Sequence, residues 1–398
     1  MMRLRRTFAL LPLLGALAGC NPDGTNDTTP TTSADPCDAL RDECLGKQQA
    51  CVVGADGPAC QACAEGEYAG AAGCAKIEGT AYTNEFDEFT VKSGEEVKGL
   101  CQSWTLHNAD EIWVNAVELT QDASSHHSNW TFVPDDKFPG DDGVWPCKDR
   151  GYSQLEAALY GGVVYAQSTQ AAHEVQKFPN GAAVRIPPYS RIIGDVHLLN
   201  TTSADVTGNA KLTLYALAES EVEVKLTPFH LSYEGLNIPP LSESRFTGRC
   251  ALDTKFSALG QPFEMDIYFV LPHYHALGKS FFLDVMGGPK DGEPVFYVGP
   301  FDGEAHGKAY DPPYTVSGAE GFSFGCDFTN PRDEYIQYGL GDQEMCEMLG
   351  FAGSKVAFES IVGSAEPEGM DGSTQLFTGA CNTLAFEWSH DKPGGTGP

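Results

Sequence analysis

KLTLYAL at residues 211–217 and MDIYFV at residues 265–270 are two strand-like stretches of a kind that recurs along most of the chain. Both are short and rich in β-branched and aromatic residues, and clusters of Gly, Pro, Asn and Asp separate such runs from one another. Helical periodicity is scarce and is best developed at Gln154–Tyr160. Regularly spaced strands with turn residues between them predict antiparallel sandwiches or barrels.

The length of 398 residues suffices for two ordinary domains and a small module. The stretch LNIPPLSE at 236–243 contains two adjacent prolines and is the expected hinge between the domains. We therefore predict an all-β fold with two tandem antiparallel β-sandwiches, jelly-roll-like, at 77–237 and 238–392. A disordered tail at 393–398 is expected to follow them.

The first twenty residues indicate export. Three arginines precede an apolar run at 8–17 that is too short to span a bilayer, so residues 1–19 are interpreted as a signal peptide. The sequence Leu17-Ala18-Gly19-Cys20 resembles a bacterial lipobox, which predicts a lipid on Cys20; an ordinary secretory signal with a chance cysteine is the alternative. Asn21 favours the outer membrane or cell surface. No later apolar run is long enough to cross a membrane, so the lipid is the expected anchor.

Two segments separate this leader from the strand-rich region. Residues 20–36 are dominated by Thr, Asp, Pro and Asn, which predicts a flexible, lipidated tether. Residues 37–76 hold six of the 13 cysteines and few large apolar residues, so this module needs disulfides to fold. Cys60 and Cys63 form a C-x-x-C pair that suits zinc or redox chemistry, but disulfides are the favoured interpretation outside the cytoplasm. No protein partner of the module can be inferred.

The formal net charge of −30 bears on possible partners. Such a surface repels nucleic acid and anionic membranes, so neither is expected as a ligand. The charge is otherwise typical of a protein that stays in solution, and it favours a cationic small molecule only weakly.

Three short motifs contain histidines at positions suited to metal binding: SSHHSNW with His126 and His127, VHLLN with His197, and PHYHALGK with His273 and His275. On a strand, residues i and i+2 project from the same face, so His273 and His275 can share a metal. Two hydrogen-bonded histidines beside a sheet are the alternative. His126 and His127 point to opposite faces of a regular strand and converge only at a turn or bulge.

Together with GDQEMCEM, these motifs follow the order found in the copper type II, ascorbate-dependent monooxygenases, a family that the region of about 80–390 resembles. The resemblance implies two antiparallel sandwiches that face each other across a solvent-filled cleft, with one copper on each. It assigns an electron-transfer copper to His126, His127 and His197, and an oxygen-binding, catalytic copper to His273, His275 and Met345.

The resemblance also implies disulfides and a reaction. The implied disulfides are Cys101–Cys147, Cys326–Cys346 and Cys250–Cys381. The implied reaction is hydroxylation of an aliphatic C–H bond of a small substrate with O2, two copper ions and ascorbate or another small reductant. A thioether ligand favours Cu(I), in keeping with this chemistry. A non-catalytic copper-binding surface lipoprotein for storage, sensing or adhesion uses the same ligands and is the main alternative.

The chain departs from the peptide-hydroxylating members of this family at the substrate clamp. Those members hold a substrate carboxylate with an arginine, an asparagine and a tyrosine, and the corresponding positions here are Leu271, Glu347 and Leu349. A carboxylate at Glu347 repels the end of a peptide, so amidation of peptides is rejected. Glu347 favours an amine-bearing substrate, unless it is an ordinary surface carboxylate.

Two hydrolase motifs are incomplete. His173-Glu174-Val175-Gln176-Lys177 begins like H-E-x-x-H but ends in lysine, which excludes the zinc-protease helix. The G-x-S-x-G match at 321–325 lies in an aromatic run that predicts a strand rather than a nucleophile elbow. The remaining histidines are expected to be surface or hydrogen-bonded residues: His107, His173, His230, His306 and His390.

Overall fold

The computed structural model describes residues 35–388, except 123, 168–170, 180, 304–305 and 340–341, and except the side chains of 155, 158 and 159. The proposed lipidation site Cys20, nearly all of the tether and the tail at 393–398 lie outside these residues. Residues Pro36–Pro398 belong to one compact unit. No helix among the described residues is long and apolar enough to cross a membrane.

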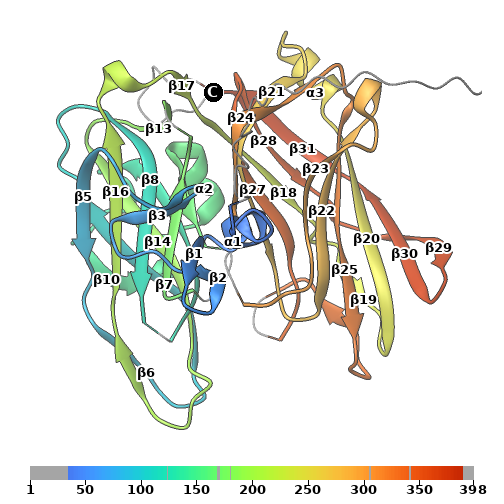
Figure 1. Ribbon diagram of the computed structural model, residues 1–398, viewed down its shortest axis with the longest axis horizontal. Helices are drawn as coiled ribbons and strands as arrows, with labels where there is room; N and C mark the ends of the chain where they lie inside the picture. The colour runs from blue at the N-terminus through green and yellow to red at the C-terminus, as the bar shows by residue number, and fades with distance from the viewer. Residues whose placement is uncertain are drawn as a thin grey trace, which may run out of the picture. The chain divides into compact units, whose positions relative to one another are not determined.

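The fold is all-β, as the sequence predicts. Figure 1 follows the chain from the blue N-terminal module through the green strands to the yellow and red ones. We refer to residues 80–225 as the first half and to residues 227–387 as the second half; each contains two large sheets.

The cysteine-rich module is built from two hairpins and a short helix. Its disulfides are Cys37–Cys51, Cys44–Cys60 and Cys63–Cys74. Cys60 and Cys63 are therefore both used structurally, each with a different partner. The elements of the module are α1 (Arg41–Gly46), β1 (Ala50–Gly54), β2 (Gly57–Gln61), β3 (Glu67–Gly70) and β4 (Gly73–Lys76).

The first half packs a five-stranded sheet against a six-stranded one around a shared core that includes Trp130, Val114 and Ile192. The five-stranded sheet runs β10 (Gly143–Pro146), β7 (Glu96–Thr105), β14 (Ser190–Leu199), β9 (Ser125–Pro134) and β11 (Gly162–Ala166). The other runs β17 (Val224–Lys225), β13 (Ala182–Ile186), β8 (Ile112–Gln121), β16 (Ala210–Leu217) and β5 (Thr80–Glu85), with β12 (His173–Lys177) also on β8. A small ribbon pairs β6 (Phe89–Val91) with β15 (Val206–Gly208), and the short helices are η1 (Cys147–Arg150), α2 (Gln154–Tyr160) and η2 (Glu219–Glu221).

The second half packs two six-stranded sheets around an aromatic core that includes Phe229, Phe246 and Phe322. One sheet runs β24 (Lys308–Ser317), β21 (Glu264–Tyr274), β27 (Cys346–Gly353), β18 (Thr227–Ser232), β28 (Val356–Ile361) and β31 (Asn382–Glu387). The other runs β23 (Pro294–Val298), β22 (Gly278–Met286), β25 (Gly321–Asn330), β20 (Ser242–Ala251), β30 (Thr374–Ala380) and β29 (Glu366–Asp371). A ribbon pairs β19 (Asn237–Ile238) with β26 (Ile336–Gln337), and the short helices are α3 (Asp253–Ala258) and η3 (Gly288–Lys290).

Among the described strands most pairs are antiparallel, as expected, but three are parallel: β13 with β17, β18 with β28 and β20 with β30. The boundary between the halves also differs from the expectation. β18 already pairs with β27 and β28, so the second half begins about ten residues before the proposed boundary at 238. The LNIPPLSE stretch therefore lies within the second half, where its two prolines connect β19 to β20.

Three disulfides cross-link segments within the two halves, and they are the pairs that the resemblance implies. Cys101–Cys147 lies in the first half, and Cys250–Cys381 and Cys326–Cys346 lie in the second. Six disulfides in one chain are typical of an oxidising, extracellular-type compartment.

Candidate metal centre and adjoining pocket

The adjacent pair His126 and His127 lies at a bulge in β9. The pairing of β9 with β14 changes from His127 opposite His197 to Ser125 opposite Leu198, which leaves His126 as an extra residue on its strand. A bulge re-aims side chains that a regular strand sends to opposite faces. As a result, the ring centroids of His126, His127 and His197 lie 4.8–5.1 Å apart.

The second pair uses strand alternation instead. His273 and His275 flank Tyr274 at the end of β21, and their ring centroids are 5.1 Å apart. Tyr274 points the opposite way and is 4% exposed within the core of the second half. Met345, which is 9% exposed, immediately precedes β27, the neighbour of β21, and lines the same pocket as His273.

The two histidine groups lie together. The centroid of His127 is 5.0 Å from that of His273, and the centroid of His126 is 6.0 Å from that of His275. Ligand atoms of His126, His127 and His275 all lie within 4.8 Å of one another. The resemblance implies two separate sites across a cleft, whereas this structure brings five imidazoles into one cluster.

An apolar contact between the halves explains this closeness. Phe178 of the first half packs against Phe269 and Phe351 of the second, with ring centroids 5.8 and 5.0 Å away. Leu271 and Leu349 belong to the same buried group. Because Phe269 and Leu271 precede His273 on β21, their burial holds the end of that strand against the first half.

The cluster favours neutral imidazoles. Burial, together with the neighbouring histidines, lowers the pKa of His126 to about 3 and holds the pKa of His127 well below its usual value. Burial likewise lowers the pKa of His275 to about 4. Burial also lowers the pKa of His197, against the opposing effect of Glu96. A neutral imidazole has a lone pair to offer to a metal, which the protonated ring lacks.

Two rings are oriented by partners outside the cluster. Nδ1 of His275 donates to the carbonyl oxygen of Gln343 at 2.8 Å, which leaves the lone pair on Nε2, a buried atom without a hydrogen-bond partner. Nε2 of His197 donates to Oε1 of Glu96 at 2.8 Å, which leaves the lone pair of Nδ1 facing Nε2 of His127 at 3.2 Å. A carbonyl or carboxylate behind a ligating imidazole is the usual support of a metal-binding histidine.

These donors fit a transition metal. Two nitrogens bound to one tetrahedral metal at bonds of ~2.0–2.1 Å lie about 3.3 Å apart, close to the observed His127–His197 separation of 3.2 Å. Imidazole suits copper, zinc, iron and nickel, and the thioether of Met345 shifts the preference towards Cu(I).

Glu344, which the sequence did not single out, ties the methionine segment to the histidine segment. Its carboxylate is 1% exposed and accepts the backbone N–H groups of His275 at 3.0 Å and Leu277 at 2.8 Å. Burial raises the pKa of Glu344 to about 7, although these hydrogen bonds oppose the shift. Glu344 therefore fixes the segment that contains Met345 relative to the segment that contains His275 and Leu277.

A pocket of about 490 Å³ opens beside the cluster. His127, His197, His273 and Met345 form one part of its wall. The three positions that differ from the peptide clamp, Leu271, Glu347 and Leu349, also line it. Further apolar residues of the wall include Ala357, Phe358, Leu384, Phe386 and Trp388.

The pocket also contains an acidic group around His230. Nε2 of His230 lies 3.7 Å from Glu347, and its Nδ1 lies 3.4 Å from Glu359. Glu347 also accepts from Ser232 at 3.3 Å and from the hydroxyl of Tyr338. Burial alone would lower the pKa of His230, but the two carboxylates raise it to about 10; in turn, His230 outweighs the effect of burial on Glu347 and lowers its pKa to about 2.

The hydrolase alternatives lack the required elements. His173–Lys177 forms β12, a strand, so the spacing of a metalloprotease helix is absent there. Gly321–Gly325 lies inside the continuous strand β25, so Ser323 does not occupy a strand-to-helix elbow.

No family model matches the chain, and no curated protein matches it. Solved structures similar to parts of it include VP54 of PBCV-1, fitted into a reconstruction of the virophage Sputnik, at 6% identity and a TM-score of 0.23, covering 70% of this chain and 94% of that one. The VP2 subviral particle of infectious bursal disease virus matches at 9% identity and a TM-score of 0.13, covering 69% of this chain and 71% of that one.

Proposed function

We propose that this protein is a copper-dependent monooxygenase that hydroxylates an aliphatic C–H bond of a small molecule, with O2 and a reductant such as ascorbate. The observation that carries the proposal is a cluster of five imidazoles beside a largely apolar pocket, which His127, His197 and His273 of the cluster line together with the thioether of Met345. Such a donor set suits a metal that cycles between Cu(II) and Cu(I). Bound copper would supply one-electron chemistry with oxygen, for which protein side chains have no equivalent.

The chain's own residues would bind and orient the reactants. Glu96 and the carbonyl of Gln343 hold His197 and His275 in the tautomers that present a lone pair to the cluster. The apolar wall would exclude water and hold the carbon skeleton of a substrate near His273 and Met345.

The acidic group suggests a substrate that carries an ammonium group. With His230 protonated, Glu347 and Glu359 leave a net charge of about −1 among the three residues. Glu234 also lines the pocket, and burial and the nearby carboxylates raise its pKa. A primary ammonium would offset this charge while its apolar part contacts Leu349 and Phe358.

The test begins with metal and oxygen. The protein from Pro36 onwards would be loaded with copper beside its Met345→Ala and His126→Ala variants, and copper per chain would be counted. We expect two coppers in the parent protein, fewer in each variant, and substrate-dependent oxygen uptake after reduction with ascorbate. A chain that binds no copper contradicts the proposal.

Stable copper binding without oxygen uptake across a panel of amines and neutral small molecules would favour the second candidate, a copper-binding surface protein for storage, sensing or adhesion. The same ligands serve both functions, so oxygen consumption rather than metal content distinguishes them.

We also propose export with a lipid on Cys20. The six disulfides support an oxidising compartment. Mass spectrometry of the protein from a bacterial membrane fraction, with Cys20→Ser as the control, would detect the lipid.

A further inference from the structure

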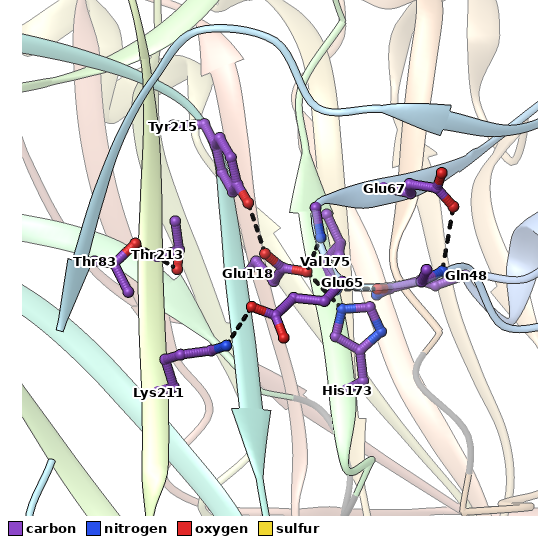
Figure 2. A network of polar contacts seen from close by, with 12 residues as sticks. Gln48, Glu65, Glu67, Thr83, Glu118, His173, Val175, Lys211, Thr213 and Tyr215 are labelled. Atoms are coloured by element: carbon purple, nitrogen blue, oxygen red, sulfur yellow. Dashed lines mark hydrogen bonds and ion pairs between the residues drawn. The ribbon is translucent and has the colours of Figure 1, made fainter. Parts of the chain in front are cut away.

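The cysteine-rich module is anchored on a buried carboxylate of the first half. Glu118 of β8 is 2% exposed and accepts the backbone N–H of Gly66 at 2.8 Å. The hydroxyl of Tyr215 donates to Glu118 at 2.7 Å, and Nε2 of His173 lies 2.8 Å away; Figure 2 shows Glu118 between these two side chains. A buried carboxylate needs such partners, so loss of the module would leave it under-satisfied.

Further contacts fix the module to the same half. The side chain of Gln48 accepts the backbone N–H of Val175 at 3.0 Å, and Lys211 pairs with Glu65 (Figure 2). Ile77, which directly follows the module, is 3% exposed and packs with Ala116 and Tyr215. Polar and apolar contacts thus hold the module to strands β8, β12 and β16 of the six-stranded sheet of the first half.

The module also reaches the second half. Nδ1 of His306 lies 3.2 Å from the carbonyl oxygen of Gly46, the last residue of α1. Nε2 of His306 lies 2.7 Å from Asp302, and the side chain is 13% exposed.

The segment around His306 is connected to the metal-ligand strand. The hydroxyl of Tyr274 donates to the carbonyl of Gly299 at 2.7 Å, and the rings of Tyr274 and Phe301 lie 6.2 Å apart. The backbone N–H of Phe301 donates to Gly278 at 3.1 Å. Tyr274 lies between His273 and His275, so a displacement of the 299–302 segment acts on both rings through one residue.

We propose that the cysteine-rich module is a strut between the halves, with Glu118 and His306 as its positioning residues. Its disulfides make it stiff, and its two attachments hold β21 at a fixed distance from the histidines of β9 and β14. The spacing of the histidine cluster then depends on a module that contributes no ligand to it. The consequence for the metal rests on the proposed function, whereas the strut itself does not.

Metal-free protein provides the test. All twelve cysteines of residues 37–398 are paired, so spin labels can be attached at Ser220→Cys in the first half and Ser257→Cys in the second, both exposed. The distribution of label-to-label distances would be measured by pulsed electron resonance in the parent protein and in His306→Ala. Lys308→Ala is the matched control, because this exposed neighbour contacts Tyr310 rather than the module.

We expect a single narrow distribution in the parent protein and in Lys308→Ala, and a wider or shifted one in His306→Ala at an unchanged melting temperature. Glu118→Ala, which breaks the other attachment, should widen the distribution in the same direction. Overlapping distributions for the parent protein and His306→Ala would overturn the strut. Because no copper is present, this outcome is independent of whether the protein oxidises a substrate.

Discussion

The histidine cluster and the pocket beside it contain imidazoles in two opposite electrostatic states. His127 and His275 have pKa values below the usual range because burial, together with the neighbouring imidazoles, disfavours the protonated ring. His230 lines the pocket that His127 also lines, but its pKa is raised to about 10 because Glu347 and Glu359 flank it. The difference shows that the partners of an imidazole, rather than its presence in a cavity, decide whether it offers a lone pair or a positive charge.

The largest effect is expected on copper affinity, from a substitution of one of the neutral histidines. His275→Ala removes a donor atom whose supporting bond to Gln343 is already in place. Copper affinity should fall by more than the roughly 10–100-fold that loss of a supporting contact costs. His230→Ala, at the other end of the pocket, should keep the parent affinity. Competition with a calibrated chelator measures both, and equal losses in the two variants would refute the assignment of the metal site.

The next prediction concerns Glu347, which belongs to the charged group around His230. Glu347→Gln keeps the shape of the side chain but removes its charge, so a primary amine should bind roughly 10–100-fold more weakly, as expected for a hydrogen bond to a charged group. Binding of hexylamine and of hexanol would be compared by calorimetry. Binding of the alcohol should not change in Glu347→Gln. The control Glu366→Gln, on exposed β29, should leave the binding of both ligands unchanged. If the parent protein binds the alcohol as well as the amine, the acidic group does not select ammonium.

The raised pKa of His230 also predicts a pH-dependent stability. A group whose pKa rises on folding from 6.5 to about 10 stabilises the protein fully below pH 6.5, and that contribution is lost as the pH rises towards 10. Glu347, lowered from 4.5 to about 2, contributes above pH 4.5 and loses its contribution as the pH falls towards 2. The two effects overlap fully between about pH 4.5 and 6.5.

His230→Gln should therefore lower the free energy of unfolding most in that window, by about 1–2 kcal/mol, a modest value because 32% of the side chain is exposed to solvent. Urea unfolding across the pH range measures the difference. The exposed His107→Gln variant is the control and should show no such window. A loss that grows towards pH 10 has the wrong sign and would contradict a protonated His230.

The sequence predicted parts of this arrangement that depend on local pattern. The strands, the helix α2 and the common face of His273 and His275 follow from periodicity, and the three sheet disulfides followed from the resemblance. His230 is hydrogen-bonded, as expected, but its place in the pocket was not predicted: its partners Glu347 and Glu359 come from β27 and β28, which flank its own strand β18, and sequence spacing does not reveal such pairing. The boundary expected at 238 rested on a proline pair, which fits a loop within a sandwich as well as a hinge between two, whereas β18 already pairs with strands of the second half.

The closeness of the two histidine groups could not be predicted from the sequence either. It depends on Phe178 packing against Phe269 and Phe351, a contact between segments that no periodicity links. The bulge at His126 was foreseen as a requirement, but its position depends on the register with β14.

The smallest effect is expected from a substitution of Glu96, which contrasts its contact with His197 and the contact of Glu359 with His230. Glu96 faces His197 as Glu359 faces His230, yet Glu96 also pairs with Lys98 at 3.0 Å, which shares its charge. Burial would raise the pKa of Glu96, but Lys98 and His197 lower it. Glu96 therefore orients a neutral ring instead of protonating it. Glu96→Ala should weaken copper binding about 10-fold, less than loss of a ligand, while Glu359→Ala should not change it. An unchanged affinity in Glu96→Ala would mean that packing within the cluster alone orients His197.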